Sequence, residues 1–203
     1  LSIYSSDDFE GRQTGTKGDR TAANFLREFY INNQIEPALN TIDYFQPYQL
    51  NLPGEMYTRN YTFPDKLRAY NRYAEGVNFV DTQNVASIIK GEIYPDSYLI
   101  ITGHLDHVGI DGDEVYNGAD DNGSGTVSIL EIAQAFQEAV EDGVRPKRSV
   151  VFLHVSGEEE GLLGSEYYVN NSLYPLEYTF DKLNHYIIGI KEQKKFLSHK
   201  KKY

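Results

Sequence analysis

Two uninterrupted apolar runs constrain the fold of this chain more than any other feature. SYLIITG (97–103) and RSVVFLHVSG (148–157) are typical of strands that are covered on both faces of a sheet. The segment between them, GTVSILEIAQAFQEAV (125–140), places its apolar residues on one stripe at helical spacing. A strand, a helix and a second strand in this order predict parallel strands joined by a right-handed crossover, and therefore an α/β fold.

The remaining patterns agree with this architecture. An amphipathic pattern predicts a helix over 19–32, and short aromatic and β-branched runs bounded by Pro and Gly predict strands over 44–52 and 84–90. Together the elements predict a three-layer α/β/α sandwich around a mostly parallel mixed central sheet. Ligands of such folds gather beyond the carboxyl ends of the strands.

Composition narrows the class of protein. With 203 residues, 40 % of them hydrophobic, the chain is long enough for one domain with a core and too short for two ordinary ones. A net charge of −11 argues against a nucleic-acid surface and suits a cationic partner. No apolar run is long enough to predict a membrane span. The chain has no cysteine, so a transition-metal site has to use His, Asp and Glu.

Three clusters of acidic and histidine residues lie where this topology places a site. GHLDH (103–107) ends the first buried strand, NGADDNGSG (117–125) precedes the crossover helix, and GEEEG (157–161) follows the second strand. So much negative charge in one crevice is costly unless a cation is present. The sequence therefore predicts a metal site at this edge of the sheet.

Each cluster suits a different part of such a site. His104 and Asp106 are two residues apart and share a face of an extended segment, so Asp106 can orient His104 on a metal. Asp121 lies among glycines and has two carboxylate oxygens, which allows it to bridge two ions. Neighbouring side chains in GEEEG are expected to diverge, so that one Glu binds a metal while the next accepts a proton from a water molecule.

The motifs GHLDHVG, GADDNGSG and SGEEEGLLGS, in this order, resemble the signature of the zinc aminopeptidases with two co-catalytic metals. That family contains secreted bacterial leucyl-type aminopeptidases and their glutamate-carboxypeptidase relatives. SSDDFEGRQTGTKGD is similar to its N-terminal segment, and the resemblance covers about residues 5–189. It implies a zinc-exopeptidase-like fold, two zinc ions, a peptide substrate with a free N-terminus and an extracytoplasmic location, periplasmic or secreted.

The resemblance also implies roles for five residues. His104 matches the ligand to one zinc and Glu159 a ligand to the other, while Asp121 matches the ligand that bridges them. Glu158 matches the general base, and Asp106 matches the acid that orients the site.

Four further residues near these motifs match no ligand of the family. They are interpreted as a variable neighbour of the bridging acid (Asp120), a solvated acid (Glu160), a residue that lines the loop (His107) and a core histidine (His154).

Two ligands that the family uses are not matched. Tyr186 in LNHYIIGI (183–190) stands where the family has an aspartate, and a distant histidine has no counterpart before the Lys-rich end. His185 and His199 are weak substitutes. We therefore expect residues 1–190 to form a single zinc-peptidase-like domain without its C-terminal portion. The Lys-rich composition of 191–203 predicts a disordered tail.

Three functions are compatible with these residues. The first is a zinc-dependent aminopeptidase, in which a metal-activated water attacks the N-terminal peptide bond with a Glu as general base. The second is a non-catalytic or truncated homologue with an incomplete metal site. The third is glutaminyl cyclase, which the resemblance implies has the same fold but a single zinc and no GADDNGSG motif. Nothing in the sequence defines the oligomeric state.

Overall fold

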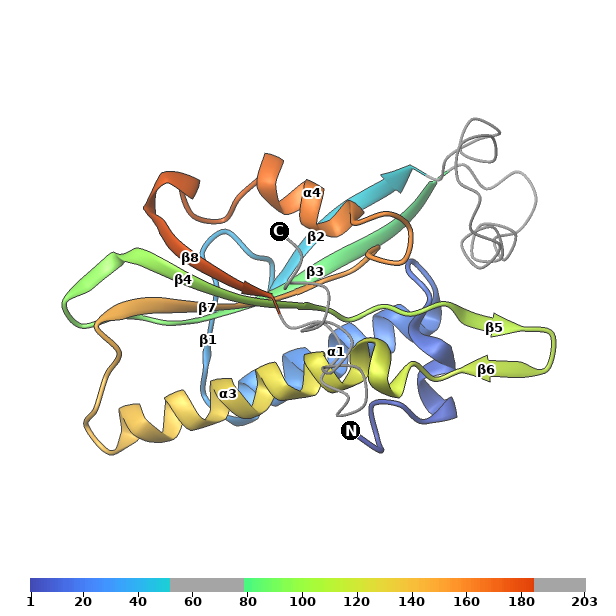
Figure 1. Cartoon of the computed structure of the whole chain (residues 1–203), viewed down its shortest axis with the longest axis horizontal. Coiled ribbons are helices and arrows are strands. Elements are labelled where there is room, and N and C mark those ends of the chain that lie inside the picture. Colours follow the sequence, from blue (N-terminus) through green and yellow to red (C-terminus); the bar gives the residue numbers. More distant parts are fainter. Residues whose placement is uncertain (52–78, 185–203) are drawn as a thin grey trace, which may run out of the picture.

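The computed structural model describes residues 1–51 and 79–184, which form a sheet with helices on both faces (Figure 1). The helices are α1 (Lys17–Asn32), α3 (Ser124–Glu141) and α4 (Leu163–Asn170), with short helical turns η1 (Asp7–Arg12), η3 (Ala119–Gly123) and η4 (Leu176–Tyr178). The strands are β1 (Glu36–Pro37), β2 (Phe45–Asn51), β3 (Phe79–Ile89), β4 (Tyr94–His104), β5 (Gly109–Asp111), β6 (Glu114–Tyr116), β7 (Arg148–Val155) and β8 (Thr179–Asn184).

The main sheet is mixed and has the order β1-β3-β7-β4-β8, with β2 paired to β3. The predicted strand, helix and strand unit is β4, α3 and β7, and β4 is parallel to both β7 and β8. The pairs of β3 with β1, β2 and β7 are antiparallel. The predicted α/β/α fold is confirmed, although the parallel pairs are confined to the strands around β4.

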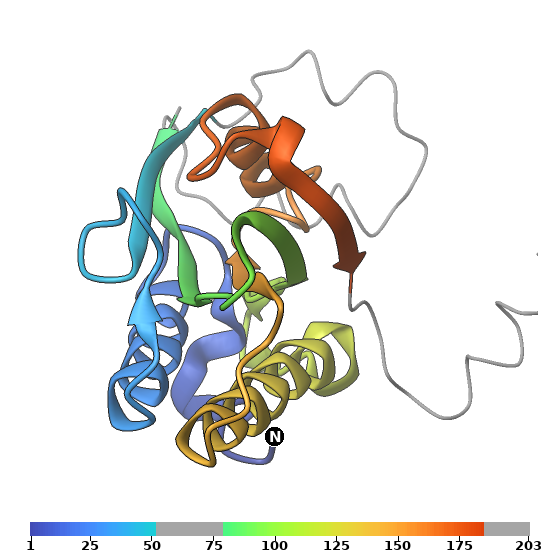
Figure 2. The same ribbon diagram turned by 90° about the vertical axis from the view of Figure 1, so that its left-hand side faces the viewer.

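Three layers follow from the alternation of side chains along the strands. Val150 and Phe152 of β7 pack against the helices α1 and α3, whereas Val151 and Leu153 face the opposite cluster together with Tyr168 of α4. Figure 2 shows α1 and α3 on one face of the sheet and α4 on the other. A continuous apolar run was therefore a correct signal of a strand buried on both faces.

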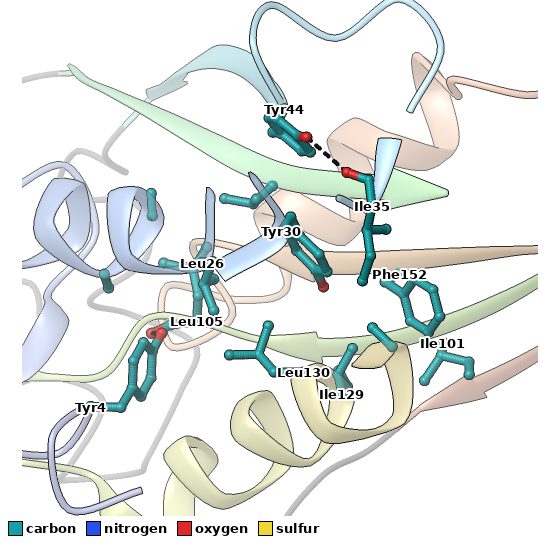
Figure 3. Packing of buried hydrophobic residues seen from close by; sticks show 14 of the residues in the cluster. Tyr4, Leu26, Tyr30, Ile35, Tyr44, Ile101, Leu105, Ile129, Leu130 and Phe152 are labelled. Atoms are coloured by element: carbon teal, nitrogen blue, oxygen red, sulfur yellow. Dashed lines mark hydrogen bonds between the residues drawn. The ribbon is translucent and has the colours of Figure 1, made fainter. Parts of the chain in front are cut away.

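The first helix begins two residues earlier than the sequence pattern indicates. Thr16 caps it, because its hydroxyl oxygen accepts a hydrogen bond from the Asp19 backbone N–H at 3.5 Å. The buried face of α1 contributes Leu26 and Tyr30 to the cluster in Figure 3, where Leu105, at the end of β4, also lies. Helix α1 thus packs close to the point at which the predicted site begins.

His154 is a core residue, as the sequence analysis expected. It is fully buried, its Nε2 lies 2.6 Å from the Tyr30 hydroxyl, and burial lowers its pKa to about 3. An unfolded chain takes up this proton below about pH 6.5, and the folded chain does so only near pH 3. The histidine therefore removes stability as the pH falls through this window.

We expect His154→Phe to reduce the acid sensitivity of the fold. Between pH 6.5 and 4.5 the parent should lose about 2 to 3 kcal/mol more of its free energy of unfolding than the variant, at about 1.4 kcal/mol per pH unit. Urea unfolding of both proteins at the two pH values measures this difference, and other titrating groups cancel in the comparison. Equal losses in the two proteins would contradict the assignment.

None of the helices in the described residues is both long and apolar enough to cross a membrane.

Candidate metal centre

The three predicted clusters meet at one edge of the sheet because β4 and β7 are parallel neighbours. His104 of β4 pairs in register with Val155, the last residue of β7, and the Leu105 N–H donates to the Val155 carbonyl at 2.8 Å. The Thr126 hydroxyl donates to the His104 carbonyl at 2.7 Å, which fixes the start of α3 at the same place. The loops after β4, after β7 and before α3 therefore face one another.

His104 lies at the centre of this cluster, with its side chain 2 % exposed. Its Nδ1 is 3.1 Å from the Asp106 backbone carbonyl, and because a carbonyl oxygen only accepts, this nitrogen carries a proton. The other nitrogen, Nε2, lies 3.2 Å from Asp121 Oδ1 and 3.9 Å from Glu158 Oε2. Nε2 is thus directed at the carboxylates.

The surrounding acids decide the charge of the cluster. Burial by itself lowers the pKa of His104, but the neighbouring carboxylates of Asp106, Asp121 and Glu158 raise it to about 11. The hydrogen bond from His104 lowers the pKa of Asp121. Burial raises the pKa of Glu158. The loops thus create a strongly negative site that favours a bound cation.

Asp106 is fully buried and holds the turn after β7 through its side chain. Its carboxylate accepts hydrogen bonds from the backbone N–H groups of Glu158 and Glu159, both at 3.3 Å, and from the Thr14 hydroxyl at 3.0 Å. Its contact with the ring of His104 is made through the backbone carbonyl, since Oδ1 is 3.6 Å from Nδ1. Asp106 therefore positions both His104 and the two glutamates.

The two glutamates converge, whereas the sequence analysis expected neighbouring side chains to diverge. Ligand atoms of His104, Glu158 and Glu159 lie within 4.8 Å of one another. The reason is that the chain turns here, with the Gly161 and Leu162 N–H groups donating to the Glu158 carbonyl. The same turn buries Glu160, which is 3 % exposed. The interpretation of Glu160 as a solvated acid was wrong.

A second set of ligand atoms includes a residue to which the sequence analysis gave no role. Ligand atoms of His107, Asp121 and Glu159 also lie within 4.8 Å of one another. Asp121 is half-exposed at the start of the α3 region, and the Asp121–Asn122 peptide is cis. Asp120 is exposed, as expected of a neighbour. Tyr186, His185 and the tail lie outside the described residues.

The N-terminal segment supports these loops. The buried Arg12 guanidinium donates to four backbone carbonyls, those of Tyr4, Leu105, Asn117 and Gly118, at 2.7 to 3.1 Å. Asp19 accepts hydrogen bonds from the hydroxyls of Thr82 and Ser156, at 2.8 and 2.9 Å. These roles were not predicted, because bonds from a side chain to groups far along the chain leave no local pattern in the sequence.

The donor set fits a transition metal. It offers imidazole nitrogen and carboxylate oxygen, which are zinc ligands, and they come from rigid strand ends and a helix start. Ligand atoms around a tetrahedral zinc are separated by roughly 3.3 Å, as follows from bond lengths of about 2.0 to 2.1 Å. The separation of 3.2 Å between His104 Nε2 and Asp121 Oδ1 is close to this value.

The sheet order and the layers define the class of fold, an α/β exopeptidase fold. The model of peptidase family M28 matches residues 84–201, more than half of the chain, so the chain belongs to peptidase family M28. The resemblance on which the sequence analysis relied is thereby confirmed.

Individual relatives agree with this assignment. Aminopeptidase NAALADL1 of Rattus norvegicus is 34 % identical over 113 residues, which is 55 % of this chain and 14 % of the relative. This chain covers 12 % to 16 % of the length of four such relatives.

Two solved structures show the same fold at low sequence identity. BSAP, a zinc aminopeptidase from Bacillus subtilis, has a TM-score of 0.62 at 16 % identity, over 93 % of this chain and 67 % of the other. A glutaminyl cyclase from Bacteroides thetaiotaomicron has a TM-score of 0.60 at 16 % identity, over 92 % and 60 %. The fold therefore does not separate these two activities.

Proposed function

We propose that this chain carries the metal centre of a zinc-dependent aminopeptidase that hydrolyses the N-terminal peptide bond of its substrates. The single observation that carries the proposal is the convergence of His104, Asp121, Glu158 and Glu159 at the ends of β4 and β7 and the start of α3. We further propose that residues 1–190 belong to one peptidase domain. An extracytoplasmic location rests on the resemblance alone.

The roles follow the chemistry of each side chain. His104 and Glu159 would each hold one of two zinc ions, and Asp121, with its two oxygens, would hold both. Bound zinc supplies a Lewis acid and lowers the pKa of a water molecule to about 7. Asp106 accepts a hydrogen bond from Nδ1 of His104, so Nε2 is the nitrogen that would bind zinc once it has lost its proton, and Asp106 also fixes the backbone of both glutamates.

Glu158 is the proposed general base. Its carboxylate would take a proton from the attacking water as the C–O bond forms, and would deliver that proton to the amine nitrogen as the C–N bond breaks. Burial raises its pKa, which brings the carboxyl group closer to the range in which proton transfer in both directions is efficient. Its side chain is 23 % exposed, so it is accessible to solvent and substrate.

The test of the proposal is zinc-dependent hydrolysis of a leucine anilide. The protein is stripped with a chelator and titrated with zinc, and release of the aniline is followed. Turnover that returns with zinc supports a peptidase. If no zinc-dependent turnover is detected, a non-catalytic member of the family becomes the better reading. Cyclisation of an N-terminal glutamine, with no anilide hydrolysis, would favour the cyclase.

A free amino group on the substrate should matter, because the site is rich in carboxylates. The acids Asp121, Glu158 and Glu159 line it, and a substrate ammonium group would balance part of their charge. We expect N-acetylation of the leucine anilide to lower kcat/KM by about 10- to 100-fold, the value of one hydrogen bond to a charged group. Steady-state kinetics on the two substrates measures this, and equal values would argue for an endopeptidase.

A further inference from the structure

His107 lies in the metal centre, although its position in the sequence suggested only a loop residue. Its side chain is 14 % exposed, and its Nδ1 is 2.8 Å from Glu159 Oε1. Its backbone N–H donates to the Arg12 carbonyl at 3.1 Å, which fixes the bend of the chain after Asp106. The imidazole is therefore held at the site by both its backbone and its side chain.

The loop that carries Asp121 makes room for this ring. Gly118 has a φ of +51°, and a Cβ built there would come within 2.5 Å of the Cγ and Cδ2 atoms of His107. Any larger residue at this position would displace the imidazole or the loop. Glycine at 118 thus allows His107 and Asp121 to approach the same point from two loops.

Three side chains from three loops converge there. The ligand atoms of His107, Asp121 and Glu159 lie within 4.8 Å of one another, and all three side chains are partly buried. Without His107, a zinc between Asp121 and Glu159 has only two protein ligands from the described residues, one fewer than the three of a catalytic zinc. With His107 it has three, as nitrogen and oxygen donors.

We propose that Nδ1 of His107 is a ligand of the zinc that Asp121 and Glu159 hold, so that this chain completes the second metal position with a histidine from the loop after β4. The inference rests on the proposed function. It assigns to His107 one of the two ligand roles of the family that the sequence of this chain does not match.

A hydrogen bond between His107 and Glu159 is the alternative reading of the same distance. Such a bond would engage only one of the two acids, Glu159, and would not account for the approach of Asp121 to the same point. A zinc ion engages both carboxylates and the imidazole together, which is why the three-residue convergence favours coordination.

The two readings are separated by His107→Asn. The amide nitrogen of Asn occupies nearly the position of Nδ1 and still donates a hydrogen bond to Glu159, but a neutral amide is a poor zinc ligand. Zinc binding to the chelator-stripped full chain is measured by calorimetry and by competition with a chromophoric chelator. His104→Asn is the matched variant for the other zinc, and circular dichroism of the metal-free proteins checks folding.

We expect the parent to bind two zinc ions, and His107→Asn to weaken one of them by more than about 100-fold, the upper end of what loss of a residue that only orients a ligand costs. X-ray absorption spectroscopy of zinc bound to His104→Asn should show one imidazole ligand. This ligand should be absent from the variant that carries both His104→Asn and His107→Asn. His107→Gln, which places its amide elsewhere, should behave like His107→Asn and replaces it if that variant does not fold.

Zinc affinity in His107→Asn within about 10-fold of the parent, with zinc-dependent turnover intact, would overturn the inference and leave the proposed function standing. Absence of zinc binding in the parent would instead defeat the proposed function itself. Zinc binding to the parent protein therefore distinguishes the failure of this inference from the failure of the proposed function.

Discussion

Glu158→Gln is expected to lower kcat on a leucine anilide by roughly 100- to 10,000-fold, the contribution that a positioned general base makes. Gln has the shape of Glu but cannot accept the proton of the attacking water at neutral pH. The exchange should therefore remove the proton transfer and preserve the packing of the turn. Steady-state kinetics at saturating zinc measures the loss.

Zinc affinity is the control for this prediction. A carboxylate oxygen of Glu158 lies within 4.8 Å of the ligand atoms of His104 and Glu159, so the geometry alone also allows Glu158 to be a ligand. A base leaves zinc affinity nearly unchanged when it is replaced, whereas a ligand does not. Glu158→Asp, which keeps the carboxyl group but shortens it, should retain part of the activity. Full activity in the Gln variant would refute the assigned base.

The convergence of the three loops could be predicted because it follows from topology. Parallel strands end at the same edge of a sheet, so the recognition of two buried strands around one helix was enough to place His104, Asp121 and Glu158 near one another. The apolar runs gave this signal without any knowledge of distant contacts. Their assigned roles in catalysis and metal binding stay predictions.

Glu160 and His107 lie where the chain leaves regular structure. The alternation rule applies inside a strand, but Glu160 follows the end of β7 and a turn carries it inward. His107 likewise follows the end of β4, where a hydrogen bond from its backbone to Arg12 sets its direction. A local pattern cannot contain that information, since it depends on a segment about a hundred residues away.

Patterns in the sequence also did not predict the short and polar elements. The strand predicted over 84–90 extends back to Phe79, because β2 pairs with β3 along its whole length. The hairpin β5–β6, the helix α4 and the strand β8 were not predicted. Their apolar residues are few and irregularly spaced, so tertiary contacts rather than local periodicity decide their structure.

Arg12 provides the largest expected effect on stability. Its guanidinium is fully buried and supplies hydrogen bonds to the carbonyls of four residues, two of which, Asn117 and Gly118, precede Asp121 while Leu105 follows His104. Arg12→Ala removes this donor from all four carbonyls, although those of Leu105 and Gly118 keep a second donor, the Tyr4 hydroxyl and the Gly123 N–H. At about 1 to 3 kcal/mol for each of the other two carbonyls, those of Tyr4 and Asn117, we expect a loss of about 2 to 6 kcal/mol in the free energy of unfolding.

Urea unfolding of the metal-free protein measures this loss, with Arg20→Ala as the control. Arg20 belongs to the same N-terminal segment, but it is exposed and donates to one carbonyl, that of Gly15, so its replacement should cost less than about 1 kcal/mol. Arg12→Lys should fall between the two, because an ammonium keeps the charge but cannot span the same four acceptors. A loss in Arg12→Ala no greater than in Arg20→Ala would show that the loops hold their positions without this guanidinium.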